Sequence, residues 1–320
     1  MKKTALMVLL VISISLPTFS QGHYSGSSFN PGDYFAPHPG WIIPVWYGYA
    51  NMDYHNAAGN KSDVLINPAP GNPTSLNIKQ NVVTNSFILM AIYGGKGKIL
   101  GANWGMMIIP TLNSPTASIA LDYYSSQTGS GNYVFTNKSL GFGDMYIQPV
   151  WLSWTKGKFS YALNYSAWAP TGRYKPHDLD NGGHGYWSHN IRVAGNVKTD
   201  SKVSVTLAAT MEINQWQKDT DFKEGSHLTF DLGSSYLLNN RGDMVGLFSH
   251  YTSQISDDKG TNGGFVSDRI AGIGGFVSYW ITPMKVGVMA RITQNFAAKN
   301  RFAGTAVQAG VNILIPNGSH

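Results

Sequence analysis

The chain has 320 residues, only 12% of which are charged, and it contains 36 glycines, 17 tyrosines, 9 tryptophans and no cysteine. The lack of cysteine excludes disulfides, thiolate metal sites and a cysteine nucleophile. The formal net charge is +6, but the lysines and arginines form no dense cluster of the kind that binds nucleic acid. The charged share is about half that of an ordinary soluble domain. Glycines where strands bend and aromatic rings at two membrane–water interfaces are typical of transmembrane β-barrels.

The first twenty residues predict a secretory signal peptide. Lys2 and Lys3 form a basic start, residues 6–16 form an apolar run too short to cross a bilayer as a helix, and residues 18–20 place small side chains before a cut at Gln21. No later apolar run reaches the length of about 18 residues that a membrane helix needs. Any passage through a membrane must therefore use strands.

Period-two alternation predicts those strands. In residues 202–214 the odd positions from Val203 to Ile213 are apolar, and the even positions from Lys202 to Asn214 are mostly polar. This segment is longer than a soluble sandwich strand of about 5–6 residues and suits a tilted membrane strand. The same alternation occurs in residues 159–169, 187–197, 228–236, 285–295 and 307–315.

The connections between the predicted strands alternate between short and long. The short ones are residues 94–97, 155–158, 199–201, 239–242 and 282–284, and the long polar ones are residues 53–77, 112–140, 171–185, 217–225 and 256–264. Short periplasmic turns and long extracellular loops are the layout of bacterial outer-membrane barrels. We therefore predict an all-β fold: a transmembrane antiparallel up-and-down β-barrel of about twelve strands, in the bacterial outer membrane.

The barrel is expected to span residues 40–316, with residues 317–320 as a C-terminal tail and residues 21–39 as a periplasmic N-terminal segment. A twelve-stranded barrel is wider than one that its own side chains fill. We therefore hypothesise that residues 21–39, which are rich in glycine, serine and aromatic residues, enter the lumen as a partial plug.

The polar faces of the alternating strands are expected to point into the barrel. A lysine or arginine that faces lipid at the membrane midplane costs about 2–4 kcal/mol, which turns such side chains inward. They either line a substrate pathway or simply fill and stabilise the wall. The candidate lumen residues are Asn190, Arg192, Glu212, Asn214, Asp231, Lys285 and Arg291. Candidates for an apolar part of the same route are Trp104, Met106, Tyr146 and Phe276.

Three histidines and two aspartates, His177, Asp178, Asp180, His184 and His189, lie close together in the sequence. Their spacing fits neither a helical calcium loop nor a paired-histidine zinc site, and a glycine-rich loop tightened by Asx-turns explains it better. We predict no metal and no cofactor.

Three serine–histidine pairs are adjacent in the sequence, at 188–189, 226–227 and 249–250. Neighbours in a strand point to opposite faces, so none of these pairs is predicted to be catalytic by itself. A serine and a histidine on adjacent strands could still form a catalytic pair.

Several segments in order carry a resemblance: residues 22–24, 35–41, 141–146, 148–149, 169–174 and 180–187. Together they resemble the meta-pathway phenol-degradation family of outer-membrane proteins, which is similar in kind to channels for hydrophobic and aromatic compounds. The resemblance implies an outer-membrane channel for small organic molecules. The motif-loop residues to which it points are Pro170, Thr171, Gly172, Tyr174, Asp180, Asn181 and Trp187.

The function that these observations favour is passive uptake of small hydrophobic or aromatic compounds, without an enzyme activity, a cofactor or an energy source. The expected partners are outer-membrane lipid and the small hydrophobic molecules themselves, and no nucleic acid. The alternatives are a non-transporting structural or adhesion barrel, an outer-membrane lipid hydrolase, and a soluble secreted β-protein.

Overall fold

A computed structural model describes His23, residues 30–61, 63–67, 74–127, 129–176, Asp178, and residues 180–260, 267–283 and 285–316. The predicted signal peptide, the C-terminal tail and most of residues 21–29 lie outside the described residues. In this described part of the chain, no helix combines the length and the apolar character that crossing a membrane would require.

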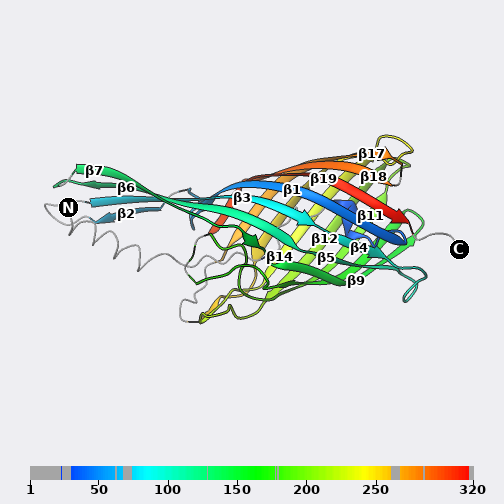
Figure 1. The fold of residues 1–320 in the computed structure, drawn as a ribbon, viewed down its shortest axis with the longest axis horizontal. Helices are drawn as coiled ribbons and strands as arrows, with labels where there is room; N and C mark the ends of the chain where they lie inside the picture. Colours follow the sequence, from blue (N-terminus) through cyan, green and yellow to red (C-terminus); the bar gives the residue numbers. More distant parts are fainter. Residues whose placement is uncertain are drawn as a thin grey trace.

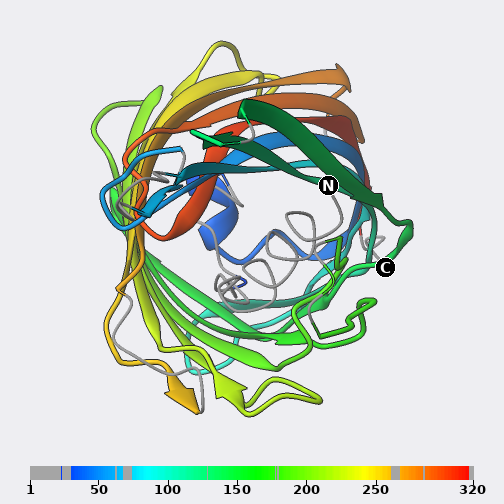
Figure 2. The ribbon, with the colours of Figure 1, turned by 90° about the vertical axis from the view of Figure 1, so that its left-hand side faces the viewer.

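The described strands close into a twelve-stranded antiparallel barrel (Figures 1 and 2). Its members are β1 (Gly40–His55), β3 with β4 (Thr74–Leu89, Ala91–Gly94), β5 with β6 (Asn103–Ile109, Thr111–Ser125), β9 (Met145–Lys156), β10 (Phe159–Ala169), β11 (Ser188–Lys198), β12 (Val203–Asn214), β14 (His227–Leu237), β15 (Met244–Gln254), β17 (Arg269–Thr282), β18 (Val286–Asn295) and β19 (Arg301–Pro316). β1 pairs with β19 from Gly40 opposite Pro316 to His55 opposite Arg301, which closes the ring. The predicted fold class and strand number are confirmed.

As predicted, short connections lie at one end of the barrel and long connections at the other. β9 and β10 are joined by two residues, of which Gly157 has φ +59°, a conformation that tight hairpins require and glycine adopts without strain. The connections at the opposite end, such as those from β10 to β11 and from β12 to β14, are long. The two long connections after β12 and β15 are themselves paired, through β13 (Phe222–Lys223) and β16 (Lys259–Gly260).

Two segments that were expected to be loops are largely strands. Residues 53–77 contain β2 (Asp63–Asn67) and the start of β3, and residues 112–140 contain most of β6 and all of β7 (Gly129–Lys138). These strands pair with one another and project beyond the barrel (Figure 1). The loop expectation was wrong because β6 buries only one row, including Ile119 and Leu121, and β7 is almost wholly exposed, so neither shows a clear membrane-strand pattern.

The apolar rows of the barrel strands face outward. In β12, Leu207, Met211 and Ile213 are exposed, whereas Ala208, Thr210 and Glu212 are buried in the interior. At the short-turn end, Tyr93 packs against Trp41 and Trp104, with ring centroids 5.0 and 5.8 Å apart, as in the aromatic belt of a membrane interface. The exposed apolar face is thus an outer girdle suited to lipid.

One short element lies inside the ring of strands. The 3-10 turn η1 (Pro31–Tyr34) precedes β1 and contacts the inner faces of β12 and β14 (Figure 2). Tyr34 is buried in an apolar cluster with Met107, Ile109, Tyr146 and Trp151. The hydrophobic core of this barrel therefore sits in the lumen, around the N-terminal turn.

Candidate functional site

Six of the seven predicted lumen residues lie buried on inward-facing rows. Asn190 and Arg192 come from β11, Glu212 and Asn214 from β12, Asp231 from β14 and Arg291 from β18. The strand register places Asn190 opposite Glu212, and Glu212 opposite His227. These side chains therefore form a polar inner face on β11, β12 and β14, with Arg291 further round the barrel on β18.

Lys285 is a correction. It was expected on the inner face of a strand, but it is exposed in the turn between β17 and β18, where its backbone N–H donates to the carbonyl of Thr282. β18 begins one residue later, at Val286, so the alternation that was extended back to Lys285 does not apply to it. At such a turn a lysine meets water rather than lipid and nothing forces it inward.

Of the four residues predicted for the apolar part of the route, two lie inside the barrel and two lie outside. Tyr146 and Phe276 are buried in the interior, whereas Met106 is exposed on the outer face. Trp104 shares the face of Met106 two residues away and packs against Tyr93 in the aromatic belt. The expectation that Met106 and Trp104 line the lumen was wrong because β5 places both outward.

The N-terminal turn is attached to the inner wall through Tyr34. Its carbonyl oxygen accepts hydrogen bonds from the indole N–H of Trp151 at 3.0 Å and from the amide of Asn164 at 3.1 Å. The guanidinium of Arg192 lies 4.7 Å from the centre of the Tyr34 ring, within the range of a cation–π interaction. Two of these contacts hold the Tyr34 backbone on the wall, and the third holds its phenol ring in the lumen.

A second contact fixes the start of the same turn. The backbone N–H of Asn30 donates to the carboxylate of Asp33 at 3.0 Å, and the Asn30 amide donates to the sulfur of Met289 on β18 at 2.9 Å. Arg291 on β18 lies 5.0 Å from the centre of the Phe248 ring. The turn therefore bridges inner faces that are contributed by distant parts of the chain.

The motif segments converge on one carboxylate that sequence reasoning did not single out, that of Asp144. Its oxygens accept hydrogen bonds from the backbone N–H of Gly172 at 2.9 Å, the backbone N–H of His184 at 2.6 Å and the Nε2–H of His23 at 2.7 Å. A Cβ on Gly183 would lie 2.4 Å from the Asp144 Oδ1, so glycine there allows the close approach. The glycines shared by the motif segments were the available signal.

The electrostatics of this junction favour an ionised Asp144. Burial on its own would raise the pKa of this carboxyl, but the hydrogen bonds and charges of His184 and His23 outweigh burial and hold the pKa well below its usual value. Burial likewise would lower the pKa of His184, but the Asp144 carboxylate raises it. The interaction between Asp144 and His184 thus joins two connections: the one from β8 (Gly141–Phe142) to β9, and the one from β10 to β11.

The remaining motif-loop residues shape that connection. The Asn181 side chain accepts from the Lys175 N–H at 2.9 Å and donates to the Lys175 and Asp178 carbonyls, as expected for an Asx-tightened loop. Tyr174 packs under Gly185, whose φ is +76°. Thr171, directly after Pro170, accepts from the Met145 N–H at 3.1 Å. Asp180 is buried beside Arg173, and Trp187 is exposed.

The histidines and aspartates near this loop do not meet at one point in the described part of the chain. Asp178 and Asp180 pair with Arg173, at 2.9 and 3.6 Å, and His184 lies beside Asp144. His189 contacts the hydroxyl of Tyr165 on the outer face, and His177 lies outside the described residues.

A serine, a histidine and an aspartate do form a chain of contacts, which bears on the hydrolase alternative. The Nδ1 of His23 lies 2.6 Å from the Ser188 Oγ, and its Nε2 contacts Asp144. However, Ser188 is 0% exposed, and its single hydroxyl hydrogen has a second acceptor in the Asn214 Oδ1, 2.6 Å from the Oγ. A nucleophilic serine needs access to substrate and donates its hydrogen to the histidine. This arrangement therefore suits attachment of the N-terminal segment rather than hydrolysis.

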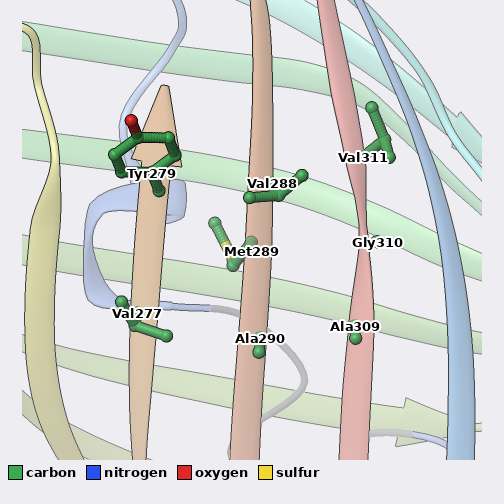
Figure 3. A pocket seen from close by; sticks show the side chains of 8 residues that line it. All are labelled: Val277, Tyr279, Val288, Met289, Ala290, Ala309, Gly310 and Val311. Atoms are coloured by element: carbon green, nitrogen blue, oxygen red, sulfur yellow. The ribbon is translucent and has the colours of Figure 1, made fainter. Parts of the chain in front are cut away.

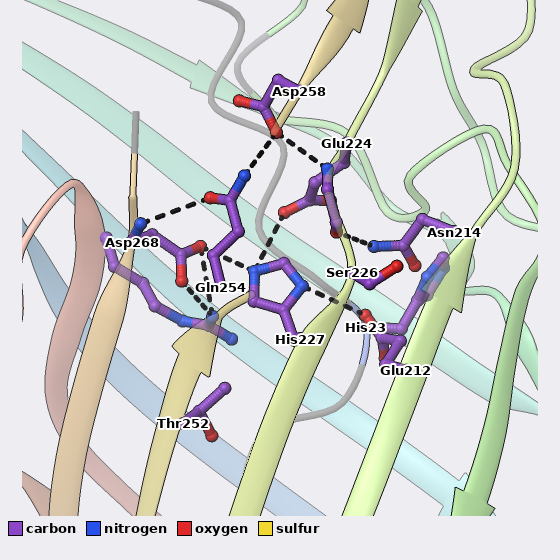
Figure 4. A network of polar contacts seen from close by, with 12 residues as sticks. His23, Glu212, Asn214, Glu224, Ser226, His227, Thr252, Gln254, Asp258 and Asp268 are labelled. Atoms are coloured by element: carbon purple, nitrogen blue, oxygen red, sulfur yellow. Dashed lines mark hydrogen bonds and ion pairs between the residues drawn. The ribbon is translucent and has the colours of Figure 1, made fainter. Parts of the chain in front are cut away.

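Another buried polar cluster lies at the long-loop end, around His227 (Figure 4). The His227 Nε2 is 3.0 Å from the Asp268 Oδ2 and 3.7 Å from the Glu224 Oε1, and its Nδ1 is 3.9 Å from the Glu212 Oε1. Arg301 contacts both oxygens of Asp268, at 3.2 and 3.3 Å. Burial raises the pKa of Glu224 to about 7.

A shallow apolar hollow of about 500 Å³ lies across β17, β18 and β19 (Figure 3). Val277, Tyr279, Ala290, Ala309 and Val311 line it from exposed rows. Met289, whose sulfur accepts from Asn30 inside the barrel, also lines it. The exposed part of the lining suits contact with lipid chains.

Comparison with known proteins places these features in context. A family model described as "Putative MetA-pathway of phenol degradation" matches residues 67–310. Among solved structures, the fold is similar to the COG4313 outer membrane channel from Pseudomonas putida F1, with a TM-score of 0.65 at 15% identity over 90% of this chain and 100% of that chain. A Pseudomonas aeruginosa FadL homologue has a TM-score of 0.39 at 11% identity over 91% of this chain and 94% of that chain. No curated protein matches the sequence.

Proposed function

The chain belongs to the MetA-pathway phenol-degradation family, and from this premise we propose that it takes up small hydrophobic or aromatic compounds across the outer membrane by passive diffusion. The protein is an outer-membrane barrel of the channel type. The proposal adds the substrate class and the mechanism: movement down a gradient, with lipid as the outer partner, and without a nucleic acid, a cofactor or an energy source.

The observation that carries the proposal is the environment of Tyr34. Its side chain is itself a phenol, and it is seated in the lumen against Met107, Ile109 and Tyr146 and below the Arg192 guanidinium. A small aromatic solute would meet the same mixture of apolar, aromatic and cationic groups. The part of the inner wall around Tyr34 therefore suits a phenol-like molecule.

The proposal includes a role for residues 21–39 as a partial plug. The described part of this segment, His23 and residues 30–39, contributes the anchors at Ser188, Asp144, Trp151 and Met289. A solute that shares the preferences of Tyr34 would compete with it for the wall. Deletion of residues 24–36 tests this role by single-channel recording, and unchanged conductance would remove it.

Uptake measurements test the transport function. A deletion strain with the wild-type gene or an empty vector would be given labelled phenol, a labelled alkane and a labelled fatty acid of matched concentration. We expect faster initial uptake of phenol with the protein present, and a smaller gain for the fatty acid. Equal rates with and without the protein would instead support a non-transporting structural or adhesion barrel.

We also propose that the protein has no enzyme activity, which the burial of Ser188 supports. Purified protein incubated with phospholipid and lipopolysaccharide is expected to release no fatty acid. A release that Ser188→Ala abolishes, while the folded barrel is retained, would favour the lipid hydrolase.

A further inference from the structure

The cluster around His227 has the composition of a metal site. Glu224 and His227 belong to the end of the β12–β14 connection and the first position of β14, and Asp268 directly precedes β17. All three are buried, and one ligand atom from each lies within 4.8 Å of the other two. One imidazole nitrogen and two carboxylate oxygens are a donor set that Zn²⁺ and Mn²⁺ accept.

The separations fit a single small cation. The Nε2 of His227 is 3.0 Å from the Asp268 Oδ2 and 3.7 Å from the Glu224 Oε1. Two ligands of a tetrahedral ion with bonds near 2.1 Å are about 3.4 Å apart. Both separations from Nε2 lie within about 0.4 Å of that value, and the third pair of ligand atoms is within 4.8 Å, so a cation could bind between them after a modest side-chain adjustment.

One atom of the candidate ligand set is buried without a hydrogen bond, which points to a missing ligand. It is the Oε1 of Glu224, on a side chain that is 2% exposed. The other Glu224 oxygen accepts a hydrogen bond from the hydroxyl of Tyr186. Tyr186 thus leaves Oε1 directed toward His227, in the way that a hydrogen bond to one oxygen orients a metal-binding carboxylate.

The buried carboxylates around His227 also favour a cation. Carboxylate oxygens of Glu212, Glu224 and Asp268 lie within 4 Å of the His227 imidazole nitrogens, and the Arg301 guanidinium contacts Asp268. Buried charge of this kind is ordinarily paired or bound to a metal.

We propose that Glu224, His227 and Asp268 bind a divalent transition-metal cation of the Zn²⁺ or Mn²⁺ class through Oε1, Nε2 and Oδ2. The cation replaces the proton that Nε2 shares with Asp268. The Nδ1–H then faces Glu212, which gives the carboxylate–histidine–metal order common in metalloproteins. The bound ion ties the β12–β14 and β15–β17 connections together beside the β13–β16 pairing.

Calorimetry on the full protein in detergent, stripped with EDTA, tests the site. We expect one equivalent of Zn²⁺ or Mn²⁺ to bind, with Ca²⁺ weaker by about tenfold or more because Ca²⁺ prefers an all-oxygen shell. Glu224→Gln and His227→Gln should each weaken binding by about tenfold or more, whereas the matched control Asp178→Asn, which alters a carboxylate paired with Arg173, should bind as the wild type does. Retained heat-modifiable migration on gels would show that each variant is folded.

The proposal would be overturned if the wild type bound no metal. It would also be overturned if Glu224→Gln and His227→Gln bound metal as tightly as the wild type does. If the variants do not fold, Mn²⁺ electron spin-echo measurements on ¹⁵N-histidine-labelled wild type decide the matter. Coupling to the nitrogens of one imidazole supports the site. Coupling to two imidazoles would place the ion at His23, Asp144 and His184, and no coupling would mean that no histidine binds it.

Discussion

The indole N–H of Trp151 on β9 donates a 3.0 Å hydrogen bond to the carbonyl oxygen of Tyr34, in the turn that precedes the first barrel strand. The two residues are 117 positions apart in the chain, and both are buried. This bond holds the backbone of the N-terminal turn on the inner wall, while the cation–π contact with Arg192 holds the ring. Backbone and side chain are thus anchored separately.

Tyr34→Ala is expected to raise single-channel conductance in planar bilayers. The substitution removes the ring that Met107, Ile109 and Arg192 hold but leaves the backbone bond to Trp151. An aromatic-to-alanine change in a core costs about 3–5 kcal/mol, but Tyr34 lies in η1 and belongs to no barrel strand, so the unfolding free energy of the barrel should fall by less. Tyr34→Phe keeps the ring and should conduct as the wild type does. Equal conductance of Tyr34→Ala and the wild type would contradict the prediction.

Gly183→Ala is expected to destabilise the junction at Asp144. The new Cβ would lie 2.4 Å from the Asp144 Oδ1 and 2.9 Å from the Cα of Gly172, so both must shift. Overpacking of this kind costs about 1–3 kcal/mol, measurable as a lower midpoint of denaturant unfolding. The control is Gly195→Ala on β11, where a Cβ meets nothing within 4 Å and the midpoint should not fall. A similar midpoint for both variants would argue against a close-packed junction.

The Asp144–His184 pair predicts a pH dependence. The His184 pKa is raised in the folded protein by Asp144, against the effect of burial, so its stabilising contribution is complete below about pH 6.5 and is lost as pH rises through the raised pKa. The Asp144 pKa is lowered by His184 and His23, again against burial, so its contribution is present above about pH 4 and is lost as pH falls toward the lowered pKa. The pair therefore stabilises the loop most between these values.

Limited proteolysis of residues 171–187 across this pH range measures the effect. Wild-type protection should decline above neutral pH, and the decline should be missing in His184→Gln. His23 contacts the same carboxylate in both proteins, so the difference between them isolates His184. Parallel pH profiles for the two proteins would count against the pair.

Leu207→Lys is expected to destabilise the barrel in lipid. Leu207 is 57% exposed on the outer face near the middle of β12, where a lysine costs about 2–4 kcal/mol at the membrane midplane. Ser201→Lys, in the exposed β11–β12 turn, is the matched control and should cost little. Equilibrium unfolding from lipid vesicles compares the two. No difference between them would mean that this face is not in contact with lipid.

Alternation in the sequence was sufficient to predict β12 within one residue, the inward direction of Arg192 and Glu212, and the number of barrel strands. It failed for Lys285, which lies in the turn before β18. Met106 was expected in the lumen from a segment with apolar residues on both faces, where alternation does not say which face is inward. Alternation also failed for β6 and β7, because a strand in a water-exposed extension has no lipid-facing row to reveal it.

By itself, the sequence determined the class of the protein. A strand in lipid must turn apolar side chains outward at every second position, and this pattern is visible within the residues of each strand. Only the tertiary structure decided how the interior is used. Tyr34 reaches Trp151, the motif glycines meet at Asp144, and Glu224 and Asp268 meet at His227 through contacts between residues far apart in the chain. Such contacts depend on the closure of the barrel and on the path of the N-terminal segment, which no local pattern encodes.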